Sequence, residues 1–135
     1  MRSAAAEGQG AVRITVDIDG SRGLRRYRAT AAFGAADVER AVAATLEHPR
    51  FRPGYAALWD LRAAPGGFPP EDLARLLTLD RRYRERMAAP RTAIVVEGDL
   101  AFGLMRRFEM MGDLEEKGVA VFRDLEAALA WVEGD

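Results

Sequence analysis

The residues best placed to do chemistry lie at the end of an apolar run, in the segment LWDLR (residues 58–62). Asp60 is a carboxylate directly after apolar residues, and Arg62 follows two positions later. Such a pair could supply a phosphate acceptor or a general base together with an anion clamp. The two side chains could equally pair with each other or cap backbone groups. The segment is therefore a candidate site that also has a purely structural interpretation.

The sequence lacks the residues that most other catalytic sites and metal sites require. The chain has no cysteine, a single histidine (His48) and two serines, Ser3 and Ser21. Thiolate catalysis and cysteine metal sites are excluded, and a Ser–His–Asp triad has no support. The segment DIDG (residues 17–20) resembles a calcium loop only superficially, because it lacks the further acidic ligands, and we interpret it as a hairpin turn. We expect no metal, no cofactor and no catalytic activity.

Charge and hydropathy exclude two further classes. The chain has 20 basic and 21 acidic residues, and the resulting net charge of −1 attracts neither nucleic acid nor an anionic membrane. Arginines alternate with aromatics in RRYRERM and MRRFEMM, but Tyr83 and Phe108 fall on apolar stripes and are expected in the core. No apolar run is long enough to span a bilayer, and the start of the chain is not a signal peptide. We expect a cytoplasmic protein.

The candidate residues must be positioned by alternating strands and helices. Residues 12–18 alternate apolar and polar side chains, which predicts a half-buried strand, and a second strand follows the turn to form a hairpin. The remaining pattern alternates helices with short apolar strands, so the order is ββαβαβαβα. It predicts a five-stranded mixed sheet with four helices in one α/β domain, residues 11–135, after a flexible tail, residues 1–10. The later segments are residues 35–48, 55–61, 70–87, 91–97, 99–111, 119–122 and 125–133.

This order, with LWDLR ending the third strand, AIVV…FGLMRRF forming a strand–helix unit and VAVFRDLEAALAWV closing the chain, resembles the STAS superfamily. The resemblance covers roughly residues 11 to 133. That superfamily includes the sporulation anti-sigma-factor antagonists, and its architecture is similar to that of the CRAL-TRIO lipid-binding domains. The chain looks most like the small uncharacterised bacterial STAS-like proteins. The resemblance implies a STAS-like fold.

The phosphorylation switch of the antagonists is missing from this chain. Asp60 and Leu61 match the first part of the antagonist motif, but Arg62 replaces its serine. The phosphorylatable serine of the relatives corresponds to a position near residues 69–72, at a helix start that would suit a phosphate. No serine or threonine lies between Thr45 and Thr78. Phosphorylation of a hydroxyl at this site is therefore chemically impossible.

We expect the working surface at the loop of residues 60–72 and the start of the third helix. In open α/β sheets, ligands bind beyond the carboxyl ends of the strands. Arginine would hold an anion there and phenylalanine would give apolar contact. The candidate residues are Asp60, Arg62, Phe68, Glu71, Phe102 and Arg106.

The leading hypothesis is a non-catalytic STAS-like module that binds a protein partner or a small apolar or anionic ligand. One alternative is a carrier of a lipid or another hydrophobic molecule, as in CRAL-TRIO domains, which would need an internal cavity. The other is a phosphate-handling enzyme that uses Asp60 and Arg62. An edge strand in the first hairpin would also permit a homodimer.

Overall fold

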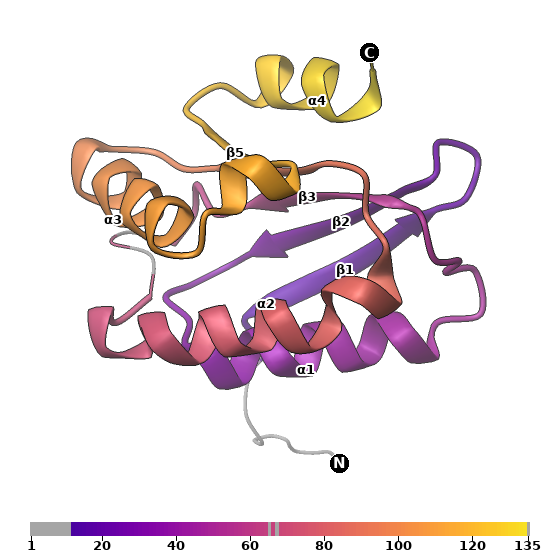
Figure 1. Ribbon diagram of the computed structural model, residues 1–135, viewed down its shortest axis with the longest axis horizontal. Coiled ribbons are helices and arrows are strands. Elements are labelled where there is room, and N and C mark those ends of the chain that lie inside the picture. Colours follow the sequence, from indigo (N-terminus) through magenta and orange to yellow (C-terminus); the bar gives the residue numbers. More distant parts are fainter. Residues whose placement is uncertain (1–11, 65, 67, 135) are drawn as a thin grey trace.

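The five strands lie side by side in the order in which they occur along the chain. The computed structural model describes residues 12–64, 66 and 68–134, so the predicted tail lies outside the described residues. The first strand is antiparallel to the second, and each later pair is parallel, which confirms the predicted mixed sheet. The strands are β1 (Ile14–Asp19), β2 (Leu24–Ala29), β3 (Ala56–Asp60), β4 (Thr92–Val95) and β5 (Val119–Phe122) (Figure 1).

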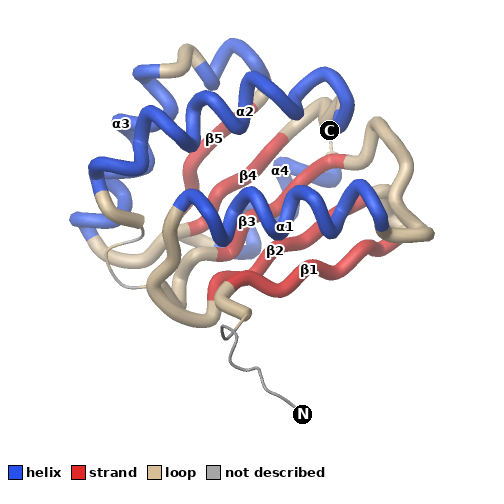
Figure 2. The backbone as a smooth tube through the Cα atoms, turned by 90° about the horizontal axis from the view of Figure 1, so that it is seen from below, coloured by secondary structure: helices blue, strands red, loops and turns tan. Residues whose placement is uncertain are grey.

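The strand order determines which face of the sheet each helix covers. Each parallel connection moves one strand further in the same direction, and such crossovers are almost always right-handed, so their helices must lie on one face. In Figure 2 the helices of these connections lie in front of the sheet, whereas the last helix lies behind it. Those in front are α1 (Ala35–Glu47), α2 (Leu73–Met87) and α3 (Asp99–Met111), and the last is α4 (Leu125–Glu133). Short 3₁₀ turns, η1 (Pro70–Asp72) and η2 (Leu114–Lys117), precede α2 and β5.

Side chains of the central strands are buried on both faces, as their continuous apolar runs predict. On β3, Leu58 packs in the smaller core beneath α4, whereas Ala57 packs in the larger core beneath α1, α2 and α3. The partly buried Trp59 lies against that larger core. Successive strand residues point to opposite faces of the sheet, so only candidate residues on the same face can contact each other.

Local signals in the sequence explain most element ends. Asp124 caps α4 as predicted, because its Oδ2 accepts a hydrogen bond from the Ala127 backbone N at 3.0 Å. The turn after β1 is held by Asp19, whose Oδ1 accepts from the Ser21 hydroxyl at 2.7 Å. The positive φ of this turn falls at Gly23 (φ +61°), not at the Asp-Gly pair.

The first turns of α1 and α2 are joined by one carboxylate. The side chain of Asp72, at the start of α2, accepts a hydrogen bond from the Ala35 backbone N at 2.8 Å. Asp37 completes the start of α1 by accepting from the Gly34 backbone N at 2.9 Å. The free N–H groups at the first turn of α1 are thus satisfied partly from a neighbouring helix.

The second strand is shorter than predicted. The alternation of residues 24–33 predicts a strand to Phe33, but β2 ends at Ala29. Beyond it the chain leaves the sheet to reach α1, Ala31 is exposed, and Phe33 is buried from a loop position. Within the described residues, no helix has both the length and the apolar character that crossing a bilayer requires.

Candidate functional site: an apolar pocket beneath helix α2

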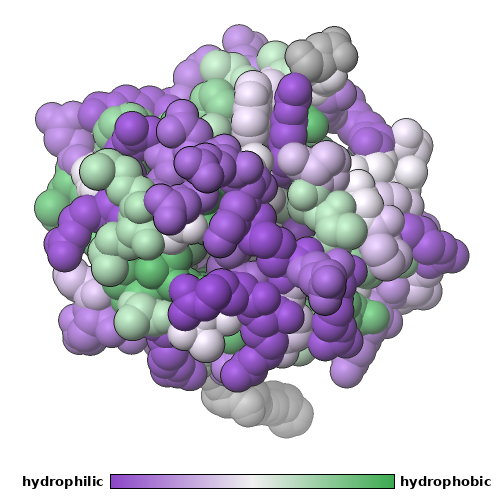
Figure 3. Space-filling view, viewed as in Figure 1, coloured by the Kyte–Doolittle hydropathy of each residue, from purple (hydrophilic) through white to green (hydrophobic). Residues whose placement is uncertain are grey.

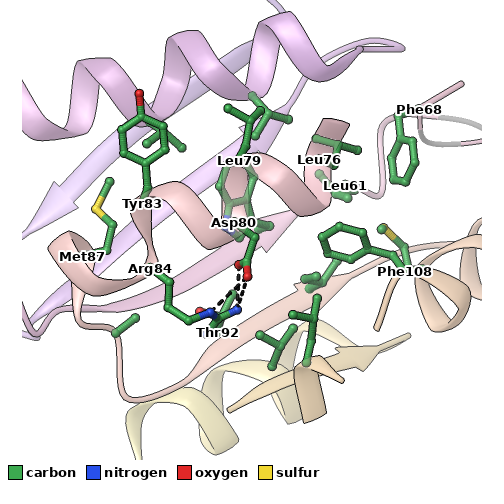
Figure 4. Close-up of a pocket in the computed structure, with 18 of the residues that line it drawn as sticks. Leu61, Phe68, Leu76, Leu79, Asp80, Tyr83, Arg84, Met87, Thr92 and Phe108 are labelled. Atoms are coloured by element: carbon green, nitrogen blue, oxygen red, sulfur yellow. Dashed lines mark hydrogen bonds and ion pairs between the residues drawn. The ribbon is translucent and has the colours of Figure 1, made fainter. Parts of the chain in front are cut away.

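A pocket of about 140 Å³ lies in the larger core, between the sheet and the helices α1, α2 and α3. Its walls are predominantly apolar and come from all three helices, the sheet and the loops that join them. Tyr83 and Met87 lie at one end of the pocket, and Phe68 and Phe108 at the other (Figure 4). The pocket therefore runs along the inner face of α2.

Aromatic side chains form one end of the pocket. The ring of Phe68 packs between those of Phe33 and Phe108, with centroids 6.2 and 6.3 Å away in tilted and edge-on arrangements. Phe68 is only 3% exposed. The sequence predicts that Phe68 offers apolar contact at a surface loop, whereas its ring points inward and lines the pocket.

A buried arginine also lines the pocket. Arg25 is 6% exposed, and its Nη1 donates to the Tyr27 hydroxyl at 2.7 Å. The Tyr27 ring is held by stacking on Trp59, with centroids 3.9 Å apart and planes 12° apart. Both Arg25 and Trp59 are among the pocket-lining residues. A buried cation is thus built into a predominantly apolar wall.

The carboxylate of the pocket wall is already paired. Asp80 on α2 accepts hydrogen bonds from Arg84 at 2.6 to 3.0 Å. Arg84 also donates to the Lys117 backbone carbonyl at 3.1 Å, which ties α2 to η2. This ion pair (dashed in Figure 4) therefore holds the wall together and leaves Asp80 little capacity for a ligand.

The sequence-predicted pair Asp60 and Arg62 does meet, but the two side chains satisfy each other. Arg62 donates from Nε to Oδ1 at 2.9 Å and from Nη2 to Oδ2 at 2.8 Å, and its backbone N adds a third bond at 3.2 Å. These hydrogen bonds from Arg62 outweigh burial and lower the pKa of Asp60. Neither residue lines the pocket. This is the structural alternative that the sequence leaves open.

The other predicted residues lie apart from the pocket. Glu71 is exposed in η1, and Phe102 is half-buried beneath the guanidinium of Arg123, 4.2 Å from its ring centroid. Arg106 donates to Glu109 at 2.6 Å. Burial dominates at Glu109, which is 3% exposed, and raises its pKa despite the neighbouring Arg106. The six predicted residues therefore do not converge on one site.

The outer surface of α3 carries exposed methionines. Met105 lines the pocket, whereas Met110 and Met111 are 67% and 55% exposed. Figure 3 shows a mostly hydrophilic face with apolar surface gathered between α3 and the start of α2. No group of three carboxylate or imidazole side chains that could hold a metal occurs among residues 12–64, 66 and 68–134.

Five strands in sequential order, three helices on one face and a fourth on the other define a STAS-like α/β fold. A solved structure shares this fold: an uncharacterised protein of the DUF3478 family from Shewanella loihica PV-4, described as having a SpoIIAA-like fold. It is 19% identical, with a TM-score of 0.61 over 94% of this chain and 99% of that chain. The comparison confirms the predicted fold. No family model matches the sequence, and neither does any curated protein.

Sequence reasoning misses Arg25, although a signal for it is present. In LRRYRA, the alternation places Tyr27 and Ala29 on one side of the strand. Arg25 is two residues before Tyr27, so it falls on the same side. A charged residue on the apolar side of a predicted strand indicates either that the strand's register is predicted wrongly or that the charge is buried. In this chain it marks a buried charge.

Proposed function

We propose that this protein is a non-catalytic binding module that holds a small apolar molecule in the pocket beneath α2. The observation that carries the proposal is a pocket of about 140 Å³ with predominantly apolar walls in the core of a small domain. Protein interiors are normally packed with few voids larger than a water molecule. Enclosed apolar cavities of about 150 Å³ bind benzene-sized molecules, and this pocket has a similar volume but is partly open to solvent.

The volume favours one class of ligand over another. Sites for drug-sized molecules occupy roughly 300 to 1,000 Å³. A pocket of about 140 Å³ suits a single ring or a short branched chain, not a phospholipid or a long acyl chain. The proposal therefore keeps the carrier hypothesis for a small hydrophobic molecule and gives up the lipid.

Two features favour this pocket over the surface loop. The carboxylate of Asp60 is occupied by Arg62, so it offers little free capacity to a partner or a phosphoryl donor. Phe68, the apolar residue expected at that loop, contributes to the pocket wall instead.

The experiment is titration of the purified protein with toluene, followed by calorimetry and by thermal unfolding. A ligand that binds only the folded state stabilises it by about 2.7 kcal/mol at about 100 times its Kd. Val42→Phe adds a ring at a pocket-lining position of α1 and should abolish toluene binding. Ala43→Phe adds the same ring at an exposed position of the same helix and should leave binding unchanged. Absence of toluene binding, or equal binding by both variants, contradicts the proposal.

A further inference from the structure

The buried guanidinium of Arg25 is incompletely satisfied. Its Nε is buried and has no hydrogen-bond partner among the residues that the structure describes. No carboxylate in that part of the chain lies within salt-bridge distance of Arg25, although nine other ion pairs form. Burying a charge without a counter-charge is costly. A charged side chain that is 6% exposed and lines a pocket therefore needs an explanation.

The orientation of Arg25 is fixed by a chain of hydrogen bonds. The Thr45 hydroxyl donates to the Ala41 carbonyl at 2.9 Å, so its single proton is used. The Tyr27 hydroxyl, 2.6 Å from the Thr45 oxygen, must therefore donate to it, and it accepts from Arg25 Nη1 at 2.7 Å. The Nη1 group is thus held in place on one side, which leaves the Nε edge of the guanidinium without a partner.

The same molecule shows what this edge binds. Arg62 uses Nε and Nη2 to hold both carboxylate oxygens of Asp60, at 2.9 and 2.8 Å. Bidentate pairing of this kind is the preferred mode of carboxylate recognition by arginine. Arg25 lines the pocket, its Nε has no partner, and the described part of the protein supplies no carboxylate within salt-bridge distance.

We propose that the pocket binds a small monocarboxylic acid, whose carboxylate pairs with the Nε edge of Arg25 and whose compact apolar body fills the space beneath α2. This inference rests on the proposed function and names its ligand class. The carboxylate would supply the missing counter-charge, and the aromatic and aliphatic walls would remove a phenyl or branched alkyl group from water.

The test compares benzoate with toluene, which share a ring and differ in the carboxylate. Wild type should bind benzoate at least about tenfold more tightly, because charge-assisted hydrogen bonds contribute about 1.5 to 3 kcal/mol and tenfold corresponds to about 1.4 kcal/mol. Arg25→Met should lose that preference and still bind toluene. Arg28→Met removes an exposed arginine from the opposite face of β2 and should match wild type.

Two further measurements keep the test decisive. Arg25→Lys keeps the positive charge but loses the planar guanidinium, so it should bind benzoate more weakly than wild type. This variant replaces Arg25→Met in the test if Arg25→Met does not fold. Benzoate should also shift one arginine Nε–H resonance in nitrogen-15 spectra, and that resonance should be absent from Arg25→Met.

The outcomes separate the two proposals. Equal affinity of wild type for benzoate and toluene, or an unchanged benzoate affinity in Arg25→Met and Arg25→Lys, overturns the carboxylate inference while the apolar pocket stands. Failure of both compounds to bind overturns the pocket function itself, and the inference with it.

Discussion

Arg62 holds both carboxylate oxygens of Asp60, with Nε 2.9 Å from Oδ1 and Nη2 2.8 Å from Oδ2. The Asp60 side chain is 12% exposed and that of Arg62 is 39% exposed, so the pair lies half in the protein and half in water. It lies at the carboxyl end of β3.

Arg62→Met should destabilise the fold by about 1 to 2 kcal/mol at neutral pH, because it leaves the buried Asp60 carboxylate without its charged donors. Arg62 lowers the pKa of Asp60, so the pair's contribution is present above the unfolded pKa and is lost as the pH falls through the lower folded value. Urea unfolding of both proteins should show a constant difference above about pH 5 that shrinks under acid conditions. Arg82→Met, which breaks the exposed pair with Glu39, is the control; an equal effect would contradict the prediction.

Glu109→Gln should change the pH dependence of stability in the opposite sense. Burial raises the pKa of Glu109, so its contribution is fully present below the unfolded pKa and is lost as the pH rises through the raised folded value. The Gln variant lacks this loss and should gain stability relative to wild type between acid and neutral pH. The measurement is thermal unfolding across that range, with the exposed Glu116→Gln as the control. Parallel profiles for wild type and Glu109→Gln would be inconsistent with a buried, charged Glu109.

Tyr27→Phe should destabilise the protein by about 1 to 3 kcal/mol, because it removes the acceptor of Arg25 Nη1 and leaves a buried charged donor unpaired. The variant also removes the hydrogen bond that Tyr27 donates to the Thr45 hydroxyl, whereas the bond from Thr45 to the Ala41 carbonyl remains. Chemical denaturation measures the difference. Tyr55→Phe, at a half-buried tyrosine, is the matched control, and a larger loss in the control would refute the ranking.

Gly118→Ala should destabilise the fold by about 2 to 6 kcal/mol, since strained backbone and overpacking each cost about 1 to 3 kcal/mol. Gly118 has φ +84°, and a Cβ there would lie 2.6 Å from the Pro90 carbonyl oxygen, which is backbone and cannot give way. Gly66→Ala is the control, because Gly66 also has a positive φ (+77°) but no atom within 4 Å of the place where a Cβ would lie. It should cost only about 1 to 2 kcal/mol of conformational strain. Equal losses would show that the contact with Pro90 is unimportant.

The order of elements could be predicted because each is encoded locally. The strict alternation of residues 12–18 gives β1, and Asp124 followed by an apolar stripe gives α4. The predicted end of β2 is wrong because Ala31 and Phe33 continue the alternation, while the path to α1 takes the chain off the sheet at Ala29. At this point the path of the chain toward α1 ends the strand, although the apolar–polar alternation of the sequence continues.

The site could be predicted only in part. The Asp60–Arg62 contact is local, two residues apart at one strand end, and it is one of the two interpretations that the segment LWDLR allows. The pocket is assembled from residues as distant as Arg25 and Val119, and its existence depends on how closely three helices pack on one sheet face. No short-range sequence pattern predicts such a pocket. The inward orientation of Phe68 likewise depends on its contacts with Phe33 and Phe108.

The direction of the hydrogen bonds from Arg25 through Tyr27 and Thr45 has a consequence for discrimination between ligands of one shape. Every proton in this chain of hydrogen bonds points away from Arg25, so the Tyr27 oxygen accepts from the arginine and its own proton is committed. The Asp80 carboxylate is committed to Arg84. Arg25, Tyr27 and Asp80 together therefore offer a hydrogen-bond donor and no free acceptor. An amine with the same ring as an acid would meet a like charge there, so the pocket would sort acids from bases by charge sign before it sorted them by size.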